Sequence, residues 1–160
     1  MGTKMTAEPR KYMLLGIGSR LNSDDSAGSI IAEEFKNPQW VAVDGGQMPE
    51  NYTGVVKREA PDVLVIIDTA GMGLEPGEFR RISLETLAKS HLFNTHAAPP
   101  ALFVSYLQSF VNTIYFIGIQ PQDTSPGESL SDNVRRGIEG IKKILQAGEV
   151  HTIPELETSL

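Results

Sequence analysis

The chain has 160 residues, a formal net charge of −6 and no cysteine. The acidic balance disfavours nucleic acid as a partner, and the missing cysteine excludes disulfides, thiolate metal sites and a cysteine nucleophile. The apolar runs are strand-sized, well short of the roughly 20 residues that cross a bilayer, so we expect no membrane insertion. The first ten residues contain no apolar run, so we expect no signal peptide and a cytoplasmic location.

Short apolar segments predict strands, and helical patterns lie between them. In chain order, the expected strands cover 12–18, 40–46, 62–70, 78–83 and 112–119, with 78–83 as a polar edge strand. The expected helices cover 27–35, 51–59, 98–110 (with Leu102, Tyr106 and Phe110 on one face) and a long last segment introduced by Ser129 and closed by Gly148. The alternation predicts an α/β domain over 1–150, with a parallel sheet covered on both faces. Residues 151–160 follow as a tail.

Polar residues after the expected strands mark the expected site, because ligands of parallel sheets bind beyond the carboxyl ends of the strands. These residues are Asp24, Asp25, Asp44, Asp68, His96, Gln120 and Asp123. The predicted rim is therefore acidic and carries one histidine.

The first of these loops, "GIGSRLNSDDSAG" at 16–28, has the glycine spacing of a phosphate-binding turn but not its other features. Leu21 stands where a dinucleotide fingerprint needs its third glycine, and the Gly-Lys-Ser/Thr ending of a P-loop is missing. Asp25 would also meet a phosphate with the wrong charge. The loop is therefore better suited to a cation.

Asp25, Asp68 and His96 form a candidate metal site with two carboxylates and one imidazole. Asp68 ends a run of five apolar residues, where an isolated carboxylate is costly. Simpler roles remain open for the others: Asp24 or Asp25 as a helix cap, Asp44 as a turn residue, and His96 as a packed or surface histidine.

The segments "LLGIGSRLNSDDSAG", "VDGGQMPENY", "LVIIDTAGMGLEPGEFR", "NTHAAP" and "YFIGIQP" occur in this order over about residues 12–147. Together they resemble the hydrogenase maturation endopeptidases of the HycI and HybD type. The resemblance is closest to the HycI branch, which matures group 4, hydrogen-evolving, membrane-associated hydrogenases.

This resemblance implies a three-layer α/β/α sandwich with a five-stranded mixed sheet, in which the fourth strand, "EFRRIS" here, is antiparallel. It implies an enzyme that removes the C-terminal extension of the [NiFe]-hydrogenase large subunit precursor after nickel insertion. The metal-contacting residues of the family match Asp25, Asp68 and His96, which are the expected catalytic residues. The nickel is carried by the substrate, and we expect the enzyme to be a monomer in solution.

The chain departs from the family pattern around the first loop. Ser19 replaces an asparagine found in many relatives, and Ser23 and Ser26 replace the glycines that usually flank the aspartate pair. Serine adopts positive φ less readily than glycine, so a stiffer loop is expected. All three candidate ligands are retained, and we expect activity to be retained with them.

The sequence leaves the mechanism open between two routes. A metal-bound water of lowered pKa could attack the peptide, or one aspartate could act as a general base while the metal orients the substrate. The chain shows no convincing serine triad and no HExxH motif. A non-enzymatic nickel checkpoint and a flavodoxin-like binding domain with magnesium on its acidic rim are the alternative functions.

The tail, with Ile153, Pro154, Leu156 and Leu160, is a sparsely apolar extended peptide that something must hold in place. We expect it to lie on its own last helix or in a groove of a neighbouring molecule. In the second arrangement it would mimic a substrate near Asp25, Asp68 or His96.

Overall fold

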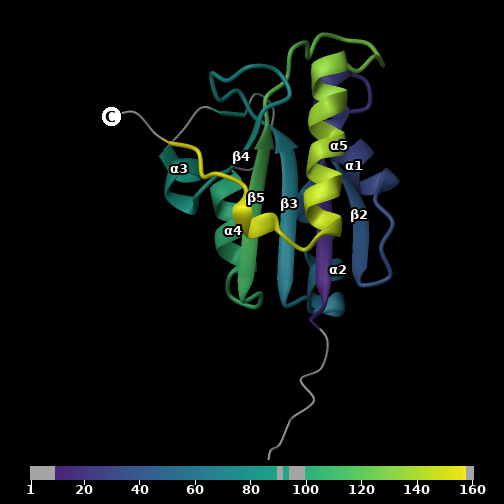
Figure 1. Ribbon diagram of the computed structural model, residues 1–160. Helices are drawn as coiled ribbons and strands as arrows, with labels where there is room; N and C mark the ends of the chain where they lie inside the picture. Colours follow the sequence, from purple (N-terminus) through teal and green to yellow (C-terminus); the bar gives the residue numbers. More distant parts are fainter. Residues whose placement is uncertain (1–9, 90–91, 94–99, 158–160) are drawn as a thin grey trace, which may run out of the picture.

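The computed structural model describes residues 10–89, 92–93 and 100–157. At its centre lies a five-stranded sheet in the order β2-β1-β3-β5-β4. Its strands are β1 (Tyr12–Ile17), β2 (Trp40–Gly46), β3 (Val63–Thr69), β4 (Phe79–Arg81) and β5 (Thr113–Ile119). All pairs are parallel except β4 with β5 (Figure 1). This confirms the predicted mixed sheet with an antiparallel fourth strand.

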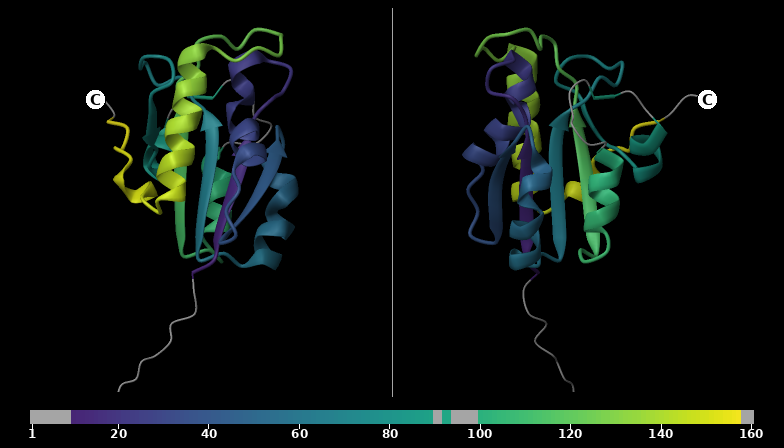
Figure 2. Two further views of the ribbon diagram at one scale, coloured as in Figure 1. Left: turned by 45° about the vertical axis from the view of Figure 1, so that its right-hand side comes forward. Right: turned by 180° about the vertical axis from the view of Figure 1, so that it is seen from behind.

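Helices cover both faces of the sheet and complete a three-layer α/β/α arrangement. One face carries α1 (Ala27–Glu34) and α5 (Asp132–Gln146), and the other carries α2 (Thr53–Glu59), α3 (Leu84–Lys89) and α4 (Pro100–Leu107) (Figure 2). Three 3₁₀ turns also occur: η1 (Ser23–Ser26), η2 (Pro49–Tyr52) and η3 (Val150–Thr152). Among the described helices, none is long and apolar enough to cross a membrane.

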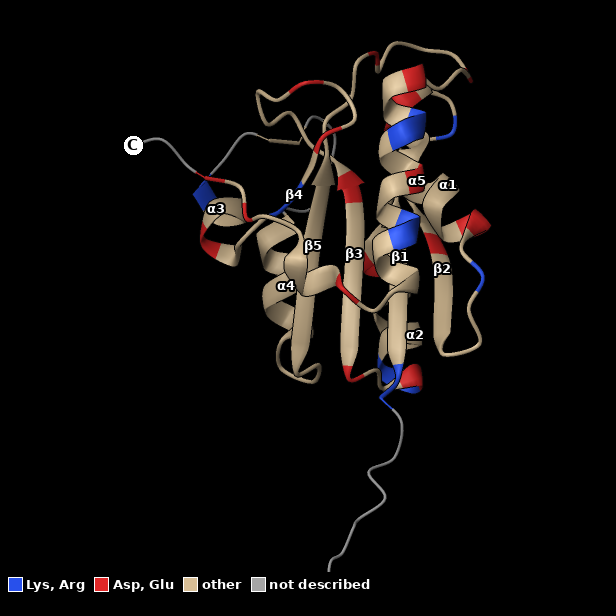
Figure 3. Ribbon diagram, in the orientation of Figure 1, with Lys and Arg blue, Asp and Glu red and all other residues tan. Residues whose placement is uncertain are grey.

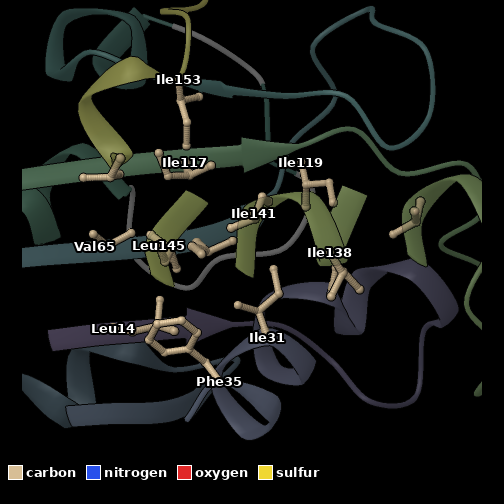
Figure 4. Packing of buried hydrophobic residues seen from close by; sticks show 14 of the residues in the cluster. Leu14, Ile31, Phe35, Val65, Ile117, Ile119, Ile138, Ile141, Leu145 and Ile153 are labelled. Atoms are coloured by element: carbon tan, nitrogen blue, oxygen red, sulfur yellow. The ribbon is translucent and has the colours of Figure 1, made fainter. Parts of the chain in front are cut away.

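The central strands are apolar on both sides because each side faces a separate core. In β1, Leu14 packs into the core under α1 and α5, whereas Met13 and Leu15 pack into the core under α2 and α4. Every residue of β3 is buried. Figure 4 shows Ile138 and Ile141 of α5 packed over the first of these cores. The long apolar runs of the sequence therefore follow from double coverage of the sheet.

Three helical details differ from the sequence prediction. The last helix begins at Asp132 with Ser131 as its N-cap, rather than at Ser129. Helix α3 was not expected. In α4 the expected apolar face points outward, with Leu102 65% and Tyr106 48% exposed. The buried side of α4 consists of Phe103, Val104 and Leu107. Because α4 is apolar around most of its circumference, periodicity alone could not identify the inner face.

The tail is held by its own subunit, through β4. The Arg81 backbone N–H donates to the carbonyl of Pro154 (2.8 Å) and the Arg81 carbonyl accepts from the N–H of Leu156 (2.7 Å). The Arg81 side chain adds a bond from Nε to the carbonyl of Ile153 (2.6 Å), and Ile153 is 1% exposed near Ile117 of β5 (Figure 4). Residues 150–157 therefore lie on their own subunit, against β4 as well as the expected last helix. The alternative position in a neighbouring molecule, near Asp25, Asp68 or His96, stays a prediction.

Candidate active site

The loop after β1 folds back on itself because Gly18 permits an unusually close approach. A Cβ on Gly18 would lie 2.4 Å from the carbonyl oxygen of Asp25. The loop is closed by bonds from the Gly18 N–H to the Gly46 carbonyl (2.9 Å) and from the Ser19 N–H to the Asp25 carbonyl (3.0 Å). The glycine spacing therefore serves chain reversal, and it places η1 directly beyond the carboxyl end of β1.

Asp25 and Asp68 meet in one pocket at this end of the sheet. Asp68, near the end of β3, is 2% exposed, while Asp25 in η1 is partly exposed. The pocket has a volume of about 70 Å³, which is enough for an ion and a few ligand atoms. Its described lining consists of Ile17, Gly18, Asp25, Gln47, Asp68, Thr69, Gly71, Leu92, Pro121 and Thr124.

Thr69, the last residue of β3, contacts both carboxylates. Its hydroxyl donates to Oδ1 of Asp25 at 2.6 Å, and its backbone N–H donates to Oδ1 of Asp68 at 2.8 Å. Sequence reasoning did not select Thr69. A hydroxyl residue directly after a strand-end aspartate was the available signal, but only the position of the neighbouring loop shows which group the hydroxyl meets.

His96 lies outside the described residues, so its role as a ligand stays a prediction. The nearest described pocket residue before it is Leu92, whose carbonyl accepts the Gly71 N–H at 2.9 Å. Within 10–89, 92–93 and 100–157, no group of three or more histidine, cysteine, aspartate or glutamate side chains is suited to hold a metal. The charged side chains in the described lining of the pocket are therefore the two carboxylates of Asp25 and Asp68.

Asp24 has a different environment from its neighbour Asp25. It is fully buried, and its carboxylate accepts the N–H groups of Gln122 (2.9 Å), Asp123 (2.9 Å) and Ser131 (2.7 Å) and the Ser131 hydroxyl (2.6 Å). We call this arrangement the Asp24 cradle. The residues at the N-cap positions of η1 and α1 are Asn22 and Ser26. The expected capping role is therefore wrong, and Asp24 instead joins the first loop to the loop between β5 and α5.

Ser23 and Ser26, which stand where the family resemblance implied glycine, differ in backbone conformation. Ser23 adopts a positive φ of 52°, where glycine is favoured. Its hydroxyl donates to the Ser125 carbonyl (2.8 Å), and its N–H donates to the Gly127 carbonyl (2.8 Å). Ser26 has an ordinary φ of −80°. Serine at position 23 thus provides a contact with the loop between β5 and α5 that glycine could not make.

Asp44 lies in β2, where its side chain accepts a backbone N–H two residues later and pairs with an arginine. Its Oδ1 accepts the Gly46 N–H (2.9 Å) and its Oδ2 lies 3.2 Å from Arg20. Partial burial lowers the pKa of Arg20, but hydrogen bonds and charges from Glu33 and Asp44 outweigh it, so that this pKa is raised overall. The bond to the Gly46 N–H is the turn chemistry considered for Asp44, although Asp44 itself lies in β2 rather than in a turn.

Gln120 and Asp123 shape the loops around the pocket. The Gln120 side-chain oxygen accepts the N–H groups of Met72 (2.7 Å) and Leu74 (3.3 Å), which fixes the loop after Asp68. Asp123 accepts the hydroxyl (2.6 Å) and N–H (2.9 Å) of Ser125, and these bonds lower the pKa of Asp123. Acidic residues therefore gather in the loops above the sheet, as Figure 3 shows.

Fold and site together define an α/β protein with a small acidic pocket at the carboxyl end of a mostly parallel sheet. The HycI family model, described as hydrogenase maturation protease, matches residues 28–147. The Hydrogenase 3 maturation protease of Escherichia coli strain K12 is 30% identical over 140 residues, which cover 86% of this chain and 90% of that protein. The chain therefore belongs to the HycI family of hydrogenase maturation proteases.

Solved structures agree with this assignment. A crystal structure of the Hydrogenase 3 maturation protease matches with a TM-score of 0.87 and 28% identity, over 93% of this chain and 98% of that one. HycI from Thermococcus kodakarensis KOD1 matches with a TM-score of 0.77 and 29% identity, over 88% of this chain and 92% of that one. The predicted endopeptidase, a hydrolase, is confirmed, and neither non-enzymatic alternative gains support.

Proposed function

We propose that this endopeptidase removes the C-terminal extension of a [NiFe]-hydrogenase large subunit precursor after nickel insertion. The observation that carries the proposal is the meeting of Asp25 and Asp68 in one small pocket at the carboxyl end of the sheet. Family membership supplies the reaction class, and the pocket supplies the means to detect a metal in the substrate.

In this proposal the nickel arrives with the precursor, bound to its cysteines, and is part of the substrate. Asp25 and Asp68 supply oxygen ligands, and His96 supplies an imidazole, a ligand type that suits nickel. The ion acts as a Lewis acid near the scissile peptide. Because the chain has no cysteine, it cannot remove the ion by thiolate competition. Cleavage would then depend on nickel because the ion completes recognition.

The remaining features of the proposal concern the surroundings of the reaction. We propose that the enzyme acts in the cytoplasm as a monomer, on a hydrogenase of the hydrogen-evolving, membrane-associated type. The absence of cysteine is compatible with a reducing compartment. Light scattering of the purified protein, alone and mixed with precursor, tests the monomer and the expected one-to-one complex.

The decisive experiment combines purified protein with purified precursor in nickel-loaded and nickel-free forms. Mass spectrometry of the large subunit should show loss of one C-terminal segment only with the loaded precursor. Binding without shortening would overturn the proposal in favour of a checkpoint. Equal shortening of both forms would overturn the nickel requirement.

A matched pair of variants links that result to the pocket. Asp25→Asn should abolish cleavage, whereas Asp44→Asn should retain it, because Asp44 contacts Arg20 and the Gly46 N–H and does not line the pocket. Equal cleavage activity in both variants would show that the reaction does not depend on the pocket carboxylate of Asp25.

A further inference from the structure

Thr69 is placed between two carboxylates that come from separate elements. Asp25 belongs to η1, after β1, and Asp68 belongs to β3. Thr69 itself is 7% exposed, with its side chain directed at Asp25 and its backbone N–H at Asp68. This residue therefore joins the two halves of the pocket.

The contact to Asp25 has the length of a strong hydrogen bond. An O–H···O⁻ distance of 2.6 Å lies in the range of charge-assisted bonds, which are roughly twice as strong as neutral ones. By binding Oδ1, the hydroxyl selects one orientation of the Asp25 carboxylate. The bond also ties a loop to the end of a fully buried strand, so the loop gains the rigidity of the sheet.

We propose that Thr69 is a positioning residue, which holds the Asp25 carboxylate at a set distance and angle from Asp68 so that both can contact the metal of the substrate. The inference depends on the proposed function, because it assigns Thr69 a role through the two carboxylates. The Thr69 backbone N–H keeps its bond to Asp68 in any non-proline variant, so side-chain substitutions test the Asp25 contact alone.

Three substitutions separate positioning from simple stabilisation. Thr69→Val keeps the shape and removes the hydroxyl, Thr69→Ala removes it without bulk, and Thr69→Ser retains it. Val and Ala should lower kcat/KM for the nickel-loaded precursor by about 10- to 100-fold, as misplacement of a reacting group does. Ser should stay within about threefold of the wild type, because the hydroxyl is the group that acts.

A double-mutant cycle shows whether Thr69 acts through Asp25. The measured quantity is the affinity for nickel-loaded relative to nickel-free precursor. In the wild-type background, Thr69→Val should reduce this preference by about tenfold. In the Asp25→Asn background it should cause no further loss, because the effects of residues that act as a unit are not additive.

The outcomes distinguish this inference from the proposed function. If the wild type neither cleaves the loaded precursor nor prefers it, the proposed function fails. If the wild type does both and the Val and Ala variants match it, only the Thr69 inference fails. A Ser variant as impaired as Val, or additive losses in the cycle, would also overturn it. Melting temperatures of all variants identify any that are unfolded, and the Ala variant then replaces Val.

Discussion

Asp24 and Asp25 are adjacent in sequence but belong to regions with different tasks. The Asp24 cradle supplies four hydrogen bonds to one fully buried carboxylate. Asp25 is partly exposed, faces the pocket and receives the Thr69 hydroxyl. The number of donors around each carboxylate explains the difference. A carboxylate surrounded by protein donors stabilises the fold, whereas one with remaining acceptor capacity can bind an ion.

The two regions also depend on each other. The cradle attaches the first loop to the loop between β5 and α5, and this attachment sets where Asp25 stands. The cradle is therefore expected to govern stability, and the pocket to govern chemistry. This distinction would be contradicted if a substitution in the cradle changed only cleavage, or if one in the pocket changed only stability.

The largest effect is expected from Asp68→Asn in the pocket. It preserves shape but removes charge, and loss of several kcal/mol of interaction with the metal should lower cleavage at least about a thousandfold. Thermal stability should stay unchanged or rise, because functional sites often trade stability for activity. Mass spectrometry and thermal unfolding check the two expectations. A large fall in melting temperature would show that Asp68, like Asp24, mainly stabilises the fold.

In the cradle, Asp24→Ala should lower the free energy of unfolding by about 3 to 5 kcal/mol. The substitution removes a fully buried carboxylate and leaves the partly buried N–H groups of three residues without their acceptor. Asp25→Ala, the matched variant, should cost about 1 kcal/mol or less because its carboxylate is partly exposed. Urea unfolding measures both. Equal costs would remove the distinction between the two aspartates.

The tail extends the comparison to a region that we expect to be structural only. Ile153→Ala removes a buried side chain and should cost about 2 kcal/mol or more. Cleavage should be retained at temperatures where the variant is folded, with Glu155→Ala as an exposed control. Loss of cleavage in the folded variant would show that residues 150–157 contribute to the reaction.

The smallest effect concerns Glu34, a carboxylate paired near the surface. Burial raises its pKa, but the bonds and charges of Arg135 and Lys142 outweigh that effect, so the pKa is lowered overall. Its contribution is therefore present above an unfolded-state pKa of about 4.3 and is lost as pH falls through the lower folded-state pKa. Glu34→Gln should cost about 0.5 to 1 kcal/mol at pH 7. Urea midpoints should show this difference shrinking below about pH 4 and in high salt.

Much of the fold could be predicted from local patterns in the sequence. Short runs of apolar residues identified four of the five strands, because a sheet covered on both faces needs apolar side chains on both, and β4 was expected as a polar edge strand. Asp68 was recognisable because a carboxylate at the end of such a run is costly. Helix α3 was missed because it has no dominant apolar face. The inner face of α4 could not be identified for the same reason, since that helix is apolar around most of its circumference.

What the sequence by itself determined is the succession along the chain of the strands and of every helix except α3, and the residue types at the strand ends. Only the tertiary structure decided which aspartate is buried in the cradle, which lines the pocket, that Thr69 joins Asp25 to Asp68, and that the tail pairs with β4. The physical reason is that these roles depend on donors distant in sequence. Asp24 and Ser131 are 107 residues apart, yet 2.7 Å separates the carboxylate oxygen from the N–H nitrogen.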